Sequence, residues 1–149
     1  MADVRFYHLQ RQPLEDALPR LLETVLQRGH RVVVRLGSAE RVAQMNLHLW
    51  TFRPDSFLPH GSSADGNADQ QPVYLTDADE NPNGADVLVL ADRAWTTDLS
   101  GFAIVCNMFD GNDAEALAEA RRRWKSAKDA GHTMTYWQQA ERGGWDKKA

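Results

Sequence analysis

VRFYHLQRQPLEDALPRLLETVLQRGHRVVVRL, residues 4–36, contains two strand-like runs on either side of a helical run. The first run, residues 4–9, alternates in apolar character and is rich in strand-forming residues. After Pro13, leucine and valine recur at helical spacing until Gly29, a residue that favours the end of a helix. The β-branched residues of 30–36 predict a second strand. Strand, helix and strand at these lengths are typical of an α/β sheet with parallel neighbours.

The rest of the chain continues this alternation. The predicted elements are a helix capped by Ser38, a polar surface loop at 61–71, a short strand at 72–76, buried strands at 86–91 and 102–109, and a long helix from Asp113 to about residue 130. The two buried strands lack polar alternation, as parallel strands covered on both faces do. We therefore predict one α/β domain over residues 1–142, with a mostly parallel sheet, followed by a flexible tail at 143–149.

Composition sets limits on location and partners. The chain has 149 residues, of which 42% are hydrophobic and 26% charged, which is ordinary for a soluble globular protein. It has no apolar run long enough for a membrane span, no secretory signal and one cysteine, Cys106, so we expect a cytoplasmic protein. The formal net charge of -4 argues against nucleic-acid binding by the whole surface, although a local cationic face is possible.

Motifs for catalysis are scarce. The chain has neither a GxGxxG after its first strand nor a phosphate loop with GK[ST], and its five histidines have no metal-ligand spacing. Cys106 lies in an apolar strand, where a thiol usually acts as a small hydrophobic group. Gly37 and Ser38, after the second strand, are a weak candidate for anion binding at a helix start. We predict no metal, no cofactor and no catalytic residue.

The stretch EARRRWKSAKDAG, residues 119–131, places five cations around one tryptophan. Residues step by about 100° along a helix, so Arg121, Trp124, Lys125 and Lys128 share one face. Acidic residues early in this helix and basic residues late in it complement the helix dipole without any ligand. The dipole does not explain why the cations align beside an indole. Trp124 is either a core residue or the floor of a groove for an acidic peptide with a hydrophobic end.

A second stretch, LWTFRPDSFLPHG at residues 49–61, is unusually rich in large apolar groups. Trp50, Phe52, Phe57 and Leu58 exceed what a connecting loop needs, and two prolines stiffen the segment. These side chains either close the end of the core, the interpretation we favour from the residues alone, or form a protein-binding patch.

Over nearly its full length the chain resembles the chi subunit family of the bacterial DNA polymerase III holoenzyme. The resemblance rests on RFYHL, LWTFRPDSFLPH, VLVL, FAIVCNMF and ARRRWKSAKDAG, in this order and spacing. The LW…F.PH segment is its most specific part. The resemblance implies a Rossmann-like three-layer α/β/α fold without nucleotide chemistry. It also implies a non-catalytic accessory subunit of the clamp-loader assembly.

Members of this family bind the acidic C-terminal tail of single-stranded-DNA-binding protein, which ends in a hydrophobic residue. The resemblance places Arg121 and Lys125 at the basic tail-binding positions, Trp124 beside them, and Lys128 on the same face. Leu117 stands where related proteins can carry another base, a departure that weakens the expected grip. The LW…F.PH segment is similar to the family's surface for the psi subunit, a small partner linking chi to the clamp loader. It implies that Trp50 and Phe57 contact a psi-like partner.

Two other functions remain open from the sequence. A nucleotide- or phosphate-dependent enzyme would use the carboxyl ends of the strands of a doubly wound sheet. A direct binder of single-stranded DNA would use the cationic face between Arg121 and Lys128, with Trp124 as a stacking platform. The overall acidity of the chain disfavours the second.

Overall fold

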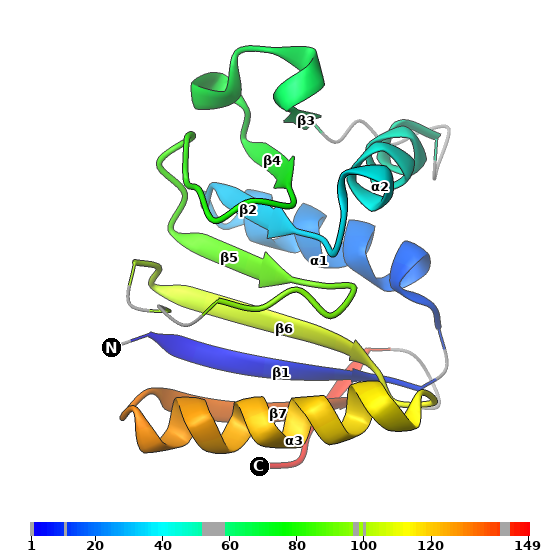
Figure 1. Cartoon of the computed structure of the whole chain (residues 1–149), viewed down its shortest axis with the longest axis vertical. Coiled ribbons are helices and arrows are strands. Elements are labelled where there is room, and N and C mark those ends of the chain that lie inside the picture. The colour runs from blue at the N-terminus through cyan, green and yellow to red at the C-terminus, as the bar shows by residue number, and fades with distance from the viewer. Residues whose placement is uncertain (1, 11, 52–58, 97–98, 100, 141–143) are drawn as a thin grey trace.

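A computed structural model describes residues 2–10, 12–51, 59–96, 99, 101–140 and 144–149 (Figure 1). Within these ranges the helices are α1 (Leu14–Gln27), α2 (Ala39–Thr51) and α3 (Ala114–Asp129). The strands are β1 (Asp3–Leu9), β2 (Val32–Arg35), β3 (Gly61–Ser62), β4 (Val73–Thr76), β5 (Val87–Leu90), β6 (Ile104–Asp110), β7 (Thr133–Gln139) and β8 (Trp145–Lys147). No helix in the described part of the chain is both long and apolar enough to cross a bilayer.

The strands form one mixed sheet in the order β3-β4-β2-β5-β6-β1-β7-β8. Neighbouring strands are parallel except at the β7–β8 pair, which is antiparallel. β1 lies between β6 and β7, so that Phe6 stands opposite Asn107 on one side and Tyr136 on the other. This register brings the start of the chain next to residues more than 100 positions later.

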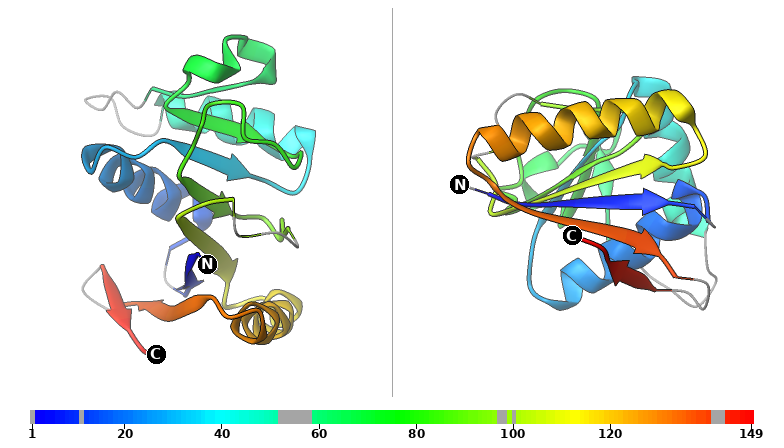
Figure 2. Two further views of the ribbon diagram at one scale, coloured as in Figure 1. Left: turned by 90° about the vertical axis from the view of Figure 1, so that its left-hand side faces the viewer. Right: turned by 90° about the horizontal axis from the view of Figure 1, so that it is seen from below.

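Helices cover both faces of the sheet, which confirms the three-layer α/β/α fold (Figure 2). α1 and α2 pack on one face, over a core that includes Leu18, Val34 and Met108. α3 packs on the other face, over Phe6 and Val105. The second face is completed by residues from the segment between β5 and β6, namely Ala94, Trp95, Leu99 and Phe102.

The buried strands explain why the sheet is parallel. All four residues of β5 are fully buried, as is the apolar centre of β2, so these strands need cover on both faces. The predictions for 86–91 and 102–109 are confirmed as β5 and β6, with ends that differ by one or two residues. The predicted cap of the long helix is also confirmed, because the Asp113 carboxylate accepts hydrogen bonds from the N–H groups of Glu115 and Ala116.

The C-terminal part of the chain differs from the prediction. The sequence predicts no strand after α3 and a flexible tail at 143–149. In the structure β7 follows α3, and β8 lies within the predicted tail and pairs with β7. The Trp145 ring packs edge-on against Tyr7, with 4.9 Å between ring centroids. Part of the expected tail is therefore a strand anchored to the sheet, because its tryptophan covers apolar surface beside β1. The polar loop at 61–71 likewise contains the short strand β3 and two 3₁₀ turns.

Candidate functional site: a groove beside α3

The long helix α3 separates its cations from its buried face. Its buried residues are all alanines, Ala116, Ala120 and Ala127, which let the helix lie close to the sheet. Arg121, Lys125 and Lys128 are exposed. No ion pair to these three cations occurs among the residues that the structure describes. Their charges are thus available to a negatively charged partner.

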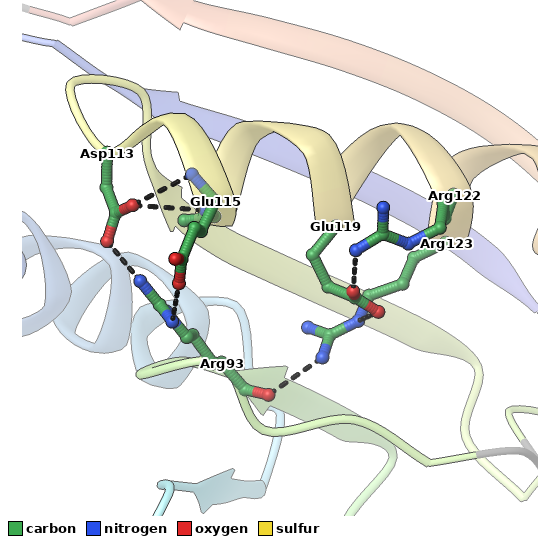
Figure 3. Close-up of polar contacts among 7 residues, drawn as sticks. Arg93, Asp113, Glu115, Glu119, Arg122 and Arg123 are labelled. Atoms are coloured by element: carbon green, nitrogen blue, oxygen red, sulfur yellow. Dashed lines mark hydrogen bonds and ion pairs between the residues drawn. The ribbon is translucent and has the colours of Figure 1, made fainter.

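Two other arginines of α3 are engaged within the protein (Figure 3). Arg122 forms an ion pair with Glu119 one turn earlier. Arg123 turns inward: it lies 3.3 Å from a Glu119 oxygen and donates a 2.9 Å hydrogen bond to the Arg93 carbonyl. Its guanidinium also stacks over the Trp95 ring at 5.1 Å from the centroid. Arg122 and Arg123 therefore differ from Arg121, Lys125 and Lys128 in having carboxylate partners within the protein.

Trp124 is half-buried, so it is neither sealed in the core nor fully exposed. Its ring meets Phe6 edge-on with 5.4 Å between centroids, and it meets Tyr136 with 6.0 Å between centroids. These contacts fix the indole against β1 and β7. Trp124 also lines a depression, so it is only partly a core residue.

That depression, which we call the α3–β7 groove, has a volume of about 440 Å³. Its lining residues come from β1, β6, α3, β7 and the end of the chain: Phe6, His8, Phe109, Leu117, Ala120, Arg121, Trp124, Tyr136, Gln138 and Ala149. Most are apolar or aromatic, and Arg121 is the one permanent cation among them. The groove thus combines an apolar floor with a guanidinium at its edge.

Of the four predicted tail-binding residues, only two line the groove. Arg121 and Trp124 meet there, as helical spacing predicts. Lys125 and Lys128 are exposed on the same helix but lie outside the lining. Leu117 also lines the groove, one turn before Arg121, and contributes apolar surface.

The sequence reading missed His8 and Tyr136. The Tyr136 hydroxyl is hydrogen-bonded to Nδ1 of His8, from positions 128 residues apart in the chain. His8 faces the groove because it follows Phe6 by two residues, and residues two apart share one face of a strand. This alternation in RFYHL was a usable signal for His8. Tyr136 lies in β7, whose mixed polar and aromatic residues do not predict a strand.

The second predicted surface is only partly described. Trp50 is 50% exposed and Leu47, one turn earlier on α2, is 68% exposed. The Trp50 ring packs against the His60 ring, with 4.4 Å between their centroids. Half of the Trp50 side chain is exposed, which by itself does not decide between closing the core and forming a patch, and Phe52 and Leu58 lie outside the described residues. Phe57, the other predicted contact, lies outside the described residues.

The described residues offer little for catalysis. They contain no group of three or more His, Cys, Asp or Glu side chains that could hold a metal ion. Cys106 is buried, and burial raises the pKa of its thiol to about 12, so the reactive thiolate is disfavoured at neutral pH. At the weak anion-site candidate, an added Cβ on Gly37 would lie 3.0 Å from a carboxylate oxygen of Asp92. A negative charge at this helix start opposes a bound phosphate.

Comparison with known proteins agrees with the fold and with the resemblance seen in the sequence. The family described as DNA polymerase III chi subunit, HolC, matches residues 1–135. The probable DNA polymerase III subunit chi of Rickettsia prowazekii (strain Madrid E) is 33% identical over 90 residues, which is 60% of this chain and 54% of that protein. The aligned region thus spans about half of the length of this curated relative. The chain belongs to the DNA polymerase III chi subunit family.

Proposed function

We propose that this chain is a non-catalytic adaptor of the replicative clamp-loader assembly, which binds the acidic C-terminal tail of single-stranded-DNA-binding protein. The observation that carries the proposal is the α3–β7 groove, where an exposed arginine borders an aromatic floor. A peptide that ends in an apolar residue presents the matching chemistry. Its side chain fits an apolar hollow, and its terminal carboxylate pairs with a guanidinium.

The two lysines outside the groove suit the rest of such a tail. Lys125 and Lys128 are exposed and follow Arg121 on α3 by one and two turns. Acidic residues that precede the last residue of the tail would lie near Lys125 and Lys128. At such short distances salt only partly screens the attraction between them. Arg121 therefore anchors the end of the peptide, and the lysines attract its acidic part.

A second surface would link the chain to the clamp loader. Leu47 and Trp50 are three residues apart on α2, so they form an apolar patch on one exposed face of the helix. We assign this patch, together with Phe57, to a psi-like partner. A double substitution, Leu47→Ala with Trp50→Ala, should abolish co-purification of clamp-loader subunits from host lysate and leave binding of the tail peptide unchanged. Loss of both activities would instead indicate a folding defect.

The tail contact is tested by titrating a fluorescent peptide of the tail into the protein and following anisotropy. We expect a dissociation constant on the order of micromolar, because a short peptide must be ordered on binding. Arg121→Ala should weaken binding by about tenfold or more, since a charge-assisted contact is lost. Arg122→Ala is the matched control, because Arg122 already pairs with Glu119. Equal affinity of the two variants would place the site elsewhere.

A bare single-stranded oligonucleotide serves as the competing ligand in the same titration. Tail binding without oligonucleotide binding supports the adaptor. Oligonucleotide binding that is lost in Arg121→Ala, with no tail binding, would favour a direct single-strand binder instead.

A further inference from the structure

A second cleft lies at the carboxyl ends of the central strands; it shares Phe109 and Ala120 with the α3–β7 groove but does not include Arg121 or Trp124. β1 and β6 are neighbours in the sheet, yet α1, which follows β1, and α3, which follows β6, pack on opposite faces. In open α/β sheets ligands bind in the crevice at such a switch in direction. A cleft of about 470 Å³ occupies this place, bordered by the ends of β1 and β6, the starts of α1 and α3, and parts of α2 and of the turn after β5. We call it the switch-point cleft.

The cleft contains a buried amide that the protein leaves unpaired. Asn107 lies in β6, is 2% exposed and lines the cleft, and its Nδ2 has no hydrogen-bond partner among the described residues. Two alanines of α3, Ala116 and Ala120, line the same cleft. An unpaired buried amide costs free energy, so such groups usually have a partner. Asn107 offers a donor to an acceptor atom that enters the cleft.

The cations of the cleft are already neutralised. Arg41 lies 3.0 Å from a Glu15 oxygen and 3.3 Å from an Asp92 oxygen. Arg93 pairs with Asp113 and with Glu115 (Figure 3). The third arginine, Arg123, faces Glu119 at 3.3 Å.

Carboxylates outnumber arginines in the cleft. Its lining includes the carboxylates of Glu15, Asp92, Asp110, Asp113 and Glu119, and the arginines Arg41, Arg93 and Arg123. A multiply charged anion would be repelled, because like charges a few ångströms apart repel even at the high effective dielectric of a protein surface. Carboxylates accept hydrogen bonds from sugar hydroxyls, as one does at the nucleoside site of dinucleotide-binding folds. The cleft therefore suits a neutral ligand with hydroxyl donors and a ring acceptor.

We infer that the switch-point cleft binds a nucleoside: Asn107 Nδ2 donates to an acceptor on the base, and the carboxylates at the cleft rim accept from the sugar hydroxyls. The volume of the cleft is within the range of small-molecule sites. Free phosphate is not the ligand. The inference does not depend on tail binding: Phe109 and Ala120 line both sites, but Arg121 and Trp124 do not line the cleft.

The test is a titration of the ¹⁵N-labelled protein with adenosine, uridine and inorganic phosphate, followed by amide chemical shifts. We expect a nucleoside to shift the amides of Gln12, Leu14, Glu15 and residues 110–113, with a dissociation constant on the order of 100 μM for a ligand of this size. Phosphate should leave these amides unchanged. Shifts confined to residues around Arg121, no shifts up to the solubility limit, or equal shifts with phosphate would each overturn the inference.

Two variants test the role of the amide. Asn107→Leu keeps the volume but removes the donor, and it should weaken nucleoside binding by about tenfold or more. Lys125→Ala lies on the exposed face of α3 outside the cleft and should bind as wild type does. Wild-type affinity in Asn107→Leu would mean that the amide meets only an internal water. If Asn107→Leu does not fold, the chemical-shift mapping of the wild-type protein still shows whether a nucleoside binds in the cleft.

Discussion

His8 shows how one side chain is tuned by residues from several elements. Its ring lies 5.0 Å from the Phe109 ring, centroid to centroid, and its Nδ1 is hydrogen-bonded to the Tyr136 hydroxyl. Burial lowers the pKa of His8 below its ordinary value of 6.5, and the positive charge of Arg121 lowers it further. Asp110 and the Gly111 backbone oppose this shift without cancelling it. The neutral form of His8 is therefore favoured in the folded protein.

This shift predicts a pH dependence of stability. A lowered pKa means that the unfolded chain takes up the His8 proton at higher pH than the folded chain does. The stability that neutral His8 contributes is present above pH 6.5 and is lost as pH falls from 6.5 through the lower pKa of the folded state. His8→Gln cannot titrate and should lose less free energy of unfolding over this window, as measured by urea unfolding on both sides of it.

The comparison with His8→Gln is needed because carboxylates also destabilise the protein as pH falls. The contribution of carboxylates that do not interact with His8 is common to both proteins and cancels in the difference. An equal loss of unfolding free energy in wild type and His8→Gln would show that the histidine plays no part.

At the scale of the element, α1 contains a proline, Pro19, which removes one hydrogen bond from the helix. Pro19 lies inside α1 and has no N–H to donate to the Glu15 carbonyl four residues earlier. Nε2 of His48, on α2, is hydrogen-bonded to this carbonyl at 2.6 Å. The gap in the α1 ladder is thus filled from α2, and the contact ties the two helices together.

A double-mutant cycle tests this compensation. His48→Ala should lower the free energy of unfolding by about 1–2 kcal/mol, because the Glu15 carbonyl loses its partner. In a Pro19→Ala background the loss should be smaller, since the new backbone N–H can donate to the same carbonyl. We expect a coupling of at least about 0.5 kcal/mol in urea unfolding. Strict additivity of the two substitutions would mean that the histidine does not replace the missing donor.

The sequence predicts the central strands well, because their apolar residues directly reflect burial. It does not predict β7 and β8, at one edge of the sheet. β2, β5 and β6 are apolar throughout or nearly so, because they are covered on both faces. β7 lies nearer the edge, is only partly buried and mixes threonine, tyrosine and glutamine. Its sequence therefore lacks the continuous apolar run that identified the central strands. β8 is three residues long and depends on pairing with β7.

For the whole molecule, charge distribution matters more than net charge. The formal net charge of -4 repels an acidic peptide at long range, whereas Lys125 and Lys128 attract it locally. Local attraction dominates within the Debye length, which is about 10 Å at 0.1 M salt. The proposed tail contact should therefore weaken as salt rises.

Two variants of equal net charge separate these effects. Lys125→Ala with Lys128→Ala and Arg20→Ala with Arg28→Ala each remove two positive charges and take the formal net charge from -4 to -6. Arg20 and Arg28 are exposed at α1, on the opposite face of the sheet from α3. The lysine pair should weaken tail binding by about fivefold at low salt and flatten its salt dependence, since each exposed charge contributes modestly.

The arginine pair should retain the steep salt dependence of wild type in the same anisotropy titration. Equal behaviour of the two double variants would mean that net charge, and not the position of the lysines, controls binding. The proposed path of the acidic peptide along α3 would then be wrong.

The sequence by itself determined the α/β class, the central strands, the capped helix α3 and the shared face of Arg121 and Trp124. Each follows from periodicity within one element, which records which side chains that element buries. Only the tertiary structure decided that His8 and Tyr136 complete the groove, that Lys125 and Lys128 stay outside it, and that Asn107 lines a second cleft. These facts depend on strand order and helix packing between distant segments, and periodicity within a segment carries no information about its neighbours in space.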